Sequence, residues 1–209
     1  MIAKKKLLII WLIGLMSGFT IMITGNTLNF WLAKEEINIK TIGVFALISI
    51  PYAINFIWAP IFDVKNIPIL SKKIGHRTSW IVTIQAFLSL AVFSLSCIKP
   101  SENLFLFGLI ALAISFFSSA QDTVLGALKT EIIDSTKQGQ VSGLYVFGYR
   151  IGMLLSSSGA IYIATYINWN LVYELFSLVI ILFAITILLL AKETNTISML
   201  PTKTKIFQD

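Results

Sequence analysis

Charged residues, cysteine and histidine are all scarce in this sequence. Only 12% of its 209 residues are charged, roughly half the fraction of an ordinary soluble domain, whereas 56% are hydrophobic and the mean hydropathy is +0.85. This polar surface is too small to cover a soluble globule, which excludes a water-soluble enzyme. The single cysteine, Cys97, excludes an internal disulfide and a thiolate metal cluster, and the single histidine, His76, leaves little for metal chemistry. We therefore expect no metal site, no cofactor and no enzymatic activity.

The cations do not form a basic face, although the net charge is +6. They stand in short segments between long apolar runs, so no nucleic acid partner is expected. A helix needs about 20 apolar residues to cross ~30 Å of hydrocarbon, and each uncharged run is near or above that length. The sequence therefore predicts an all-α integral membrane protein, a bundle of six spans in contact with membrane lipid, at about residues 7–33, 41–62, 78–98, 103–128, 141–165 and 170–191.

Lysine and arginine are distributed unevenly between the two sides of this bundle. Twelve lie on the side of the two termini and three on the other, which predicts that both termini face the cytoplasm. The cluster Lys4–Lys6 is similar to the start of a secretory signal, but the apolar run after it is too long and no cleavage site follows. We expect a retained first helix and a disordered cytoplasmic tail over residues 192–209.

Arg150 and Asp122 are the most informative polar residues within the predicted spans. An arginine near the centre of a span costs ~2.5–3.5 kcal/mol on insertion scales, so it needs a partner or a wet cavity. Counting residues from the cytoplasmic side places Asp122 at ~10 Å and Arg150 at ~14 Å depth, which predicts that the two interact. The pair is either a static clamp between the fourth and fifth helices or part of an electropositive cavity wall for an anionic substrate, with Asp122 as counter-ion or proton carrier.

Two further stripes have helical spacing. Ser17, Thr20, Thr24 and Thr27 recur on one side of the first helix, where they either line a cavity or bond back to the helix backbone. The fifth helix carries a small-residue stripe, every fourth residue, that allows another helix to approach closely: Gly148, Gly152, Ser156 and Ala160.

Short motifs in a fixed order carry a family resemblance from about Gly14 to Ala191. They are Ser17-Gly18, Thr27-Leu28 with Trp31-Leu32, Thr41-Ile42-Gly43, Pro51-Tyr52, Phe56–Pro60 with Asp63, then Pro68, Gly75, Arg77 and Trp80, then Gln85, Phe117–Asp122, Gln138-Gly139 and Gly148–Leu154. In this order they resemble the amino-terminal half of the AmpG family of muropeptide permeases, which belongs to the major facilitator superfamily.

The resemblance implies an importer in the bacterial inner membrane that carries anhydro-muropeptides, fragments of recycled peptidoglycan, with the proton gradient. It implies a gate on the cytoplasmic side at Asp63 and Arg77, whose charges simple positive-inside topology also explains. Among the polar residues of four spans, we expect a substrate and proton pathway lined by Asp122, Arg150, Gln121, Tyr149, Gln85, Thr24 and Thr27. A related branch of the superfamily carries acetyl-coenzyme A, so another bulky anion is the alternative substrate.

The sequence also departs from the family pattern. The family usually has a second acidic residue four positions after Asp122, where this chain has Gly126, and often a lysine where this chain has Asn55. Losing the acid removes one candidate proton site.

The resemblance covers one half of a transporter, and such transporters bind substrate between two halves. Three outcomes stay open. The chain pairs with itself or with a separate carboxy-terminal half, it is a decayed permease remnant, or it is a non-transporting membrane interaction protein. For a half on its own, we expect the polar faces of the first and fourth helices and the small-residue stripe of the fifth to meet lipid.

Overall fold

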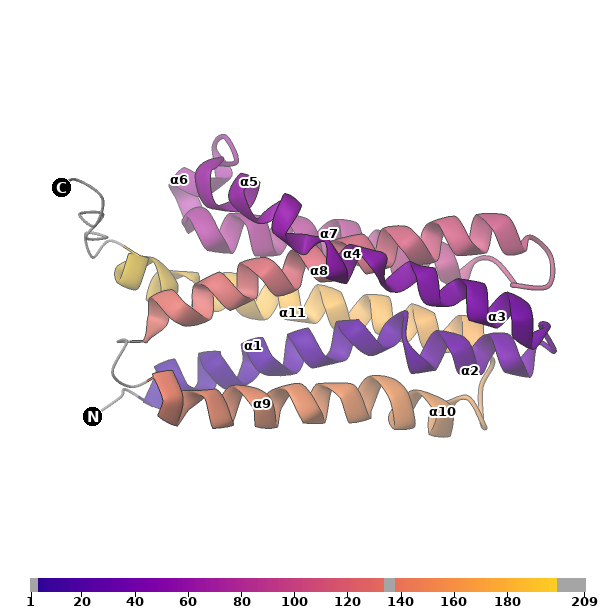
Figure 1. Ribbon diagram of the computed structural model, residues 1–209. Coiled ribbons are helices and arrows are strands. Elements are labelled where there is room, and N and C mark those ends of the chain that lie inside the picture. The colour runs from indigo at the N-terminus through magenta and orange to yellow at the C-terminus, as the bar shows by residue number, and fades with distance from the viewer. Residues whose placement is uncertain (1–3, 134–137, 199–209) are drawn as a thin grey trace.

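The computed structural model describes residues 4–133 and 138–198, and that part of the chain contains helices and no strand. The long helices lie side by side along one axis (Figure 1). The first helix begins and the last helix ends at the same end of this bundle, which we call the terminal end (Figure 1). The predicted fold class, an all-α membrane bundle, is confirmed.

The helices follow the predicted order of spans. Span 1 is made of α1 and α2, span 2 of α3 to α5, span 3 of α7, span 4 of α8, span 5 of α9 to α10, and span 6 of α11. Their bounds are α1 Lys4–Ile23, α2 Asn26–Lys34, α3 Ile39–Phe45, η1 Ala46–Ser49, α4 Ile50–Ala53, η2 Asn55–Ile57, α5 Ala59–Val64, α6 Leu70–Ile74, α7 His76–Ser96, α8 Leu104–Ile132, α9 Gln138–Leu154, η4 Leu155–Gly159, α10 Ala160–Ile163 and α11 Trp169–Ser198.

Within residues 4–133 and 138–198, five stretches are long and apolar enough to cross a membrane: Lys4–Lys34, Ile39–Ile57, His76–Ser96, Leu104–Ile132 and Trp169–Leu190. The remaining predicted span, 141–165, is present as α9, the π-helical turn η4 and α10 in unbroken succession. The fourth predicted span ended too early, because α8 continues to Ile132. Helix α11 likewise passes the predicted end at 191 and reaches Ser198, while residues 199–209 of the expected tail lie outside the described residues.

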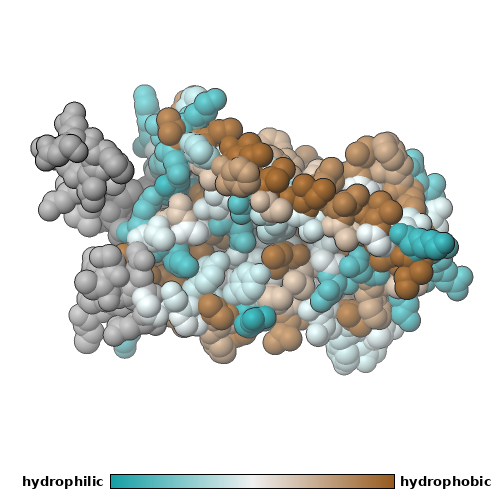
Figure 2. All heavy atoms as spheres, viewed as in Figure 1, coloured by the Kyte–Doolittle hydropathy of each residue, from teal (hydrophilic) through white to brown (hydrophobic). Residues whose placement is uncertain are grey.

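Span 2 is broken into short α-helical and 3₁₀ pieces. Pro51 and Pro60 lie in the first turns of α4 and α5, where a proline is tolerated but cannot extend the hydrogen bonding of the helix before it. Span 2 is also the least buried of the candidate spans. In Figure 2 its residues form a brown hydrophobic ridge along the upper edge of the bundle, and the band below it, toward α9, is paler and more hydrophilic.

The spans of the bundle pack mainly in pairs. Helix α1, in span 1, packs along α9, in span 5. The short helices of span 2 pack mainly on α8, which forms span 4. Helices α7 and α11 pack together behind them. Helix α7 also packs along α8, so span 3 joins the α7–α11 pair to span 4.

Two buried apolar clusters fill the bundle. One lies toward the end opposite the termini and includes Trp31, Phe107 and Tyr173, and the other lies toward the terminal end and includes Ile10 and Val124. Phe117 and Phe183 contact both clusters. The polar side chains of α1 and α8 lie near the level where the two clusters meet.

Glycines bring the backbones of α1 and α9 into direct contact. A Cβ atom added to Gly18 would collide with the carbonyl oxygen of Tyr149, and one added to Gly148 would collide with the carbonyl oxygen of Trp11. A Cβ atom added to Gly14 or Gly152 would likewise collide with a backbone carbonyl oxygen of the other helix. The expectation that the small-residue stripe of the fifth helix meets lipid is therefore wrong: α1, the first span of the same bundle, packs into it.

Candidate functional site

A polar cluster joins α8, α1 and α9 at the centre of the bundle. Ser17 is fully buried on α1 and donates a hydrogen bond to the Asp122 carboxylate on α8. The hydroxyl of Tyr145, on α9, donates to Ser17 Oγ over 3.1 Å. Ser17 thus donates one hydrogen bond to Asp122 and accepts one from Tyr145. Three spans meet at one carboxyl group.

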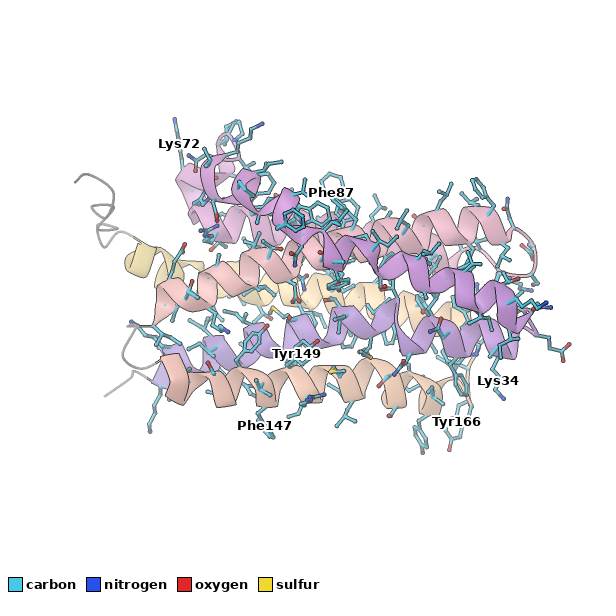
Figure 3. All side chains as sticks on the ribbon, viewed as in Figure 1. Lys34, Lys72, Phe87, Phe147, Tyr149 and Tyr166 are labelled. Carbon is cyan, nitrogen blue, oxygen red and sulfur yellow. The ribbon has the colours of Figure 1, made fainter. Side chains whose placement is uncertain are left out.

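Two more tyrosines extend this cluster. The rings of Tyr145 and Tyr149 stack with centroids 6.3 Å apart, and Tyr149 lies on the side of α9 toward α1, opposite Phe147 (Figure 3). From span 2, the hydroxyl of Tyr52 lies 2.6 Å from Ser118 Oγ on α8. Ser118 is one helical turn from Asp122, so span 2 contributes to the same polar face of α8. The sequence analysis singled out Tyr149 and included Tyr52 in a family motif, but it missed Tyr145, whose only sequence signal is a phenol placed within an apolar span.

Gln121 and Gln85 lie beside this cluster, inside the core. Gln121 Nε2 donates to Thr20 Oγ1 over 3.3 Å, and Gln85 Nε2 lies 3.8 Å from the sulfur of Met16. Both side chains are fully buried, and the Oε1 atom of each has no hydrogen-bond partner among the described residues. The two amides therefore attach α8 and α7 to consecutive turns of α1.

The two predicted threonines of span 1 lie nearer the opposite end of the bundle. Thr27 Oγ1 donates to the carbonyl oxygen of Ser156 over 2.5 Å, within the π-helical turn η4. Thr24 is half-buried in the turn that separates α1 from α2. Neither threonine contacts Asp122, and Thr27 joins the break in span 1 to the π turn in span 5.

The predicted Asp122–Arg150 interaction is absent from the structure. Arg150 is exposed, its Nη1 atom lies 3.9 Å from the sulfur of Met153, and no ion pair joins it to Asp122. The reason is rotation about the helix axis. Because α9 packs on α1 through Gly148 and Gly152, a residue two positions after Gly148 lies about 200° around the helix and points away from α1. The prediction, and with it the static clamp, was wrong because it matched depth alone.

A charged cluster lies at the terminal end. Arg77, at the start of α7, makes ion pairs with Asp63 of α5 at 2.6 Å and with Glu131 of α8 at 2.8 Å. Arg77 Nη1 and the His76 ring also reach the carbonyl oxygen of Phe62, at 3.3 and 2.8 Å. The structure therefore brings the predicted residues Asp63 and Arg77 together and adds Glu131, which the sequence analysis did not single out.

Replacing Arg77 by alanine is expected to lower the stability by about 1 kcal/mol and the Tm by about 2–4 °C. Most of this loss comes from Glu131, because the Asp63 side chain is 56% exposed and screened by solvent. Arg77→Lys is expected to restore part of it, since an ammonium lacks the guanidinium fork that bonds two carboxylates. Thermal unfolding in detergent measures both variants. An unchanged Tm in Arg77→Ala would show that the cluster adds nothing to stability.

One large hollow of the described chain is distinct from the polar cluster. It is an apolar groove of about 640 Å³ between span 2 and α8, lined by residues such as Leu47, Ile54, Leu112 and Phe116. Its walls offer no charged group for a polar solute. Among the described residues, no three His, Cys, Asp or Glu side chains gather closely enough to hold a metal ion.

Comparison with known proteins gives close relatives of one functional kind. The chain is 50% identical over 196 residues to the protein named "Putative transporter AmpG 1" of Rickettsia felis, covering 94% of this chain and 44% of the relative. It is 47% identical over 204 residues to the protein of the same name from Rickettsia prowazekii, covering 98% and 46%. It is 32% identical over 190 residues to the anhydromuropeptide permease of Escherichia coli, covering 90% and 38%.

Residues 6–108 also match the family model described as acetyl-coenzyme A transporter 1. The chain spans somewhat less than half the length of the curated relatives it matches.

Proposed function

The chain belongs to the AmpG family of membrane transporters, and we propose that it forms the amino-terminal half of a permease that imports anhydromuropeptides together with protons. It is a multi-pass membrane protein with the partial fold of a major facilitator transporter. Its relatives are transporters and permeases by name, which supports transport of a small molecule and no enzymatic role for this chain.

The observation that carries this proposal is the environment of Asp122. Its carboxyl group lies within a membrane span, receives a hydrogen bond from Ser17 and has no ion pair with a cation among the described residues. A carboxyl group held by neutral hydroxyls can take up and release a proton without first breaking an ion pair. Tyr145 and Tyr149 beside it offer aromatic faces to a sugar ring. Asp122 is thus the proposed proton carrier and the tyrosines part of the proposed substrate wall.

The remaining predicted site residues fall into four groups in this proposal. Gln121, Gln85 and Thr27 support the pathway by fixing α8, α7 and span 5 on span 1, which keeps the polar cluster in register. Thr24 lies in the turn between α1 and α2 and lines the pathway there in this proposal. Asp63 and Arg77, with Glu131, form the gate. Arg150 contacts the anionic substrate from the flank of α9.

The proposed location is the bacterial inner membrane, with the terminal end of the bundle in the cytoplasm. The lysines and arginines of the sequence support this orientation, since twelve of them lie on the side of the termini. The Asp63–Arg77–Glu131 cluster then lies at the cytoplasmic surface, where it holds the ends of spans 2, 3 and 4 together when that side is closed.

A second half completes the proposed pathway, because transporters of this fold bind substrate between two halves that move against each other. The paler band between span 2 and α9 is the face proposed to meet it (Figure 2). The second half is a separate carboxy-terminal polypeptide, the rest of a longer chain, or another copy. There are two alternatives to a working permease: a non-transporting interaction protein and a decayed permease remnant. A transport assay distinguishes both from the proposed function.

Uptake of radiolabelled anhydromuropeptide into proteoliposomes tests the proposal. The chain is reconstituted alone and together with the carboxy-terminal half of the Rickettsia felis relative, with and without an inward proton gradient. We expect gradient-driven uptake in at least the second preparation. Radiolabelled acetyl-coenzyme A serves as the second substrate, because a family model for its transporter matches residues 6–108. Uptake of neither compound in either preparation would contradict a transport function.

Arg150→Gln is expected to raise the KM for anhydromuropeptide by about tenfold, since one charge-assisted hydrogen bond to the substrate is lost. The effect on folding is expected to be small, because Arg150 is exposed and its guanidinium lies beside the sulfur of Met153 rather than beside a carboxylate. Arg150→Lys is the control that keeps the positive charge. Equal KM values for Arg150→Gln and the wild-type protein would remove Arg150 from the substrate pathway.

A further inference from the structure

The polar face of α8 continues past Asp122 toward the terminal end. Gly126 lies one turn beyond Asp122, and a Cβ atom added to it would meet no other atom within 4 Å. Lys129 follows on the same face, seven residues or about 10 Å from Asp122 along the helix. The carboxylate and the ammonium group therefore bound an open space whose floor is Gly126. We call this space the Gly126 niche.

Tyr145 forms the wall of the Gly126 niche. The Nζ atom of Lys129 lies 4.3 Å from the centroid of the Tyr145 ring, a cation–π contact. The hydroxyl of the same tyrosine donates to Ser17, which bonds to Asp122. One aromatic side chain of α9 thus spans the interval between the two charged groups of α8, and Tyr149 stacks on it.

The charge of Lys129 is not neutralised by a described carboxylate. The acidic residue nearest to it in α8 is Glu131, which projects in another direction because residues two apart do not face each other on a helix. Glu131 is bound to Arg77 through two nitrogen atoms. Lys129 also borders a small hollow of about 90 Å³ between the end of α8 and the start of α9, lined by Lys129, Thr130, Ile133 and Ser142. Its ammonium group therefore has room for an anion beside it.

We infer that the Gly126 niche binds a carboxylate-bearing part of the transported sugar derivative, with the carboxylate on Lys129 and an uncharged ring on Tyr145 and Tyr149. This inference rests on the proposed function and deepens it, because it names a specificity-determining cation. A cation next to a pair of aromatic rings matches a solute that carries both a ring and an acid group. Arg150, on the other flank of α9, contacts a different part of the same substrate.

The test compares two radiolabelled probes, anhydromuropeptide with free peptide carboxylates and the same compound with those carboxylates amidated. Lys129→Gln is expected to reduce the preference for the acid over the amide by roughly tenfold, and Lys129→Arg is expected to keep it. Lys72→Gln is the matched control, because Lys72 is an exposed lysine on α6 that projects away from the bundle (Figure 3). A preference unchanged in Lys129→Gln, or reduced equally in Lys72→Gln, would overturn the inference.

Equilibrium binding of the same two probes to the purified full chain separates this inference from the proposed function. Acid-selective binding that Lys129→Gln removes supports the niche even in a preparation that transports nothing. Binding without acid selectivity overturns the niche while leaving transport standing. Filling the space provides a second variant: Gly126→Leu is expected to weaken binding of both probes by at least about tenfold, whereas Gly43→Leu, at another open glycine on α3, is expected to leave binding unchanged.

Discussion

Gly18→Leu is expected to leave most of the protein unfolded or aggregated. The Cα atom of Gly18 lies against the backbone of Tyr149, so that even a Cβ atom would overlap a carbonyl oxygen. A backbone group cannot move aside as a flexible side chain can. Helices α1 and α9 would have to separate, and the hydrogen bond between Tyr145 and Ser17 would be lost with them. The cost is about 3 kcal/mol or more, the upper range for overpacking.

The yield of monodisperse protein in size-exclusion chromatography and the Tm in detergent measure this effect. The matched control is Gly43→Leu, a substitution of the same size in a span where a Cβ atom meets nothing within 4 Å. The control is expected to change the Tm by no more than about 2 °C. Equal yields of the two variants would show that the glycine contact between α1 and α9 does not hold the bundle together.

Asp122→Asn is expected to abolish proton-driven accumulation of substrate. Asparagine has nearly the volume of aspartate and its oxygen can still accept the hydrogen bond from Ser17, but it cannot take up and release a proton. If one proton moves with each substrate, a gradient of one pH unit sustains about tenfold accumulation. The variant is expected to lose this accumulation and to keep the exchange of substrate down its own gradient.

Proteoliposomes carrying a pH gradient measure accumulation, and counterflow without a gradient measures exchange. Ser17→Ala is the control, since it removes the hydrogen bond to Asp122 and leaves the titratable group in place; reduced but gradient-dependent uptake is expected. Full accumulation by Asp122→Asn would assign the proton to another group. Loss of both exchange and accumulation would indicate that Asp122 binds substrate, and proton coupling would then not be assigned to Asp122.

Several features of the protein follow from its composition. Long apolar runs predicted the helices of the bundle, because the length and polarity of a segment decide whether it can cross a membrane. The sequence also pointed to Asp122, since a carboxylate inside a span is costly however its helix is rotated about its axis. The motif order also indicated the AmpG family, which the relatives confirm.

The partners of these residues depend on rotation about each helix axis, which hydropathy does not report. Small residues at every fourth position of span 5 indicated that another helix packs there, yet only the structure shows that this helix is α1. That contact turns Tyr145 toward Ser17 and Asp122, and it turns Arg150 away. Glu131 joins Arg77 for a related reason, because the ends of α7 and α8 meet only after both helices have packed.

The sequence by itself thus determined which segments are apolar enough to form the helices of a membrane bundle and which family they belong to. The tertiary structure decided which residues of those segments face one another. The physical reason is that insertion depends on the summed polarity of a segment, whereas the facing of side chains depends on where two backbones can approach most closely, here at the glycines of α1 and α9.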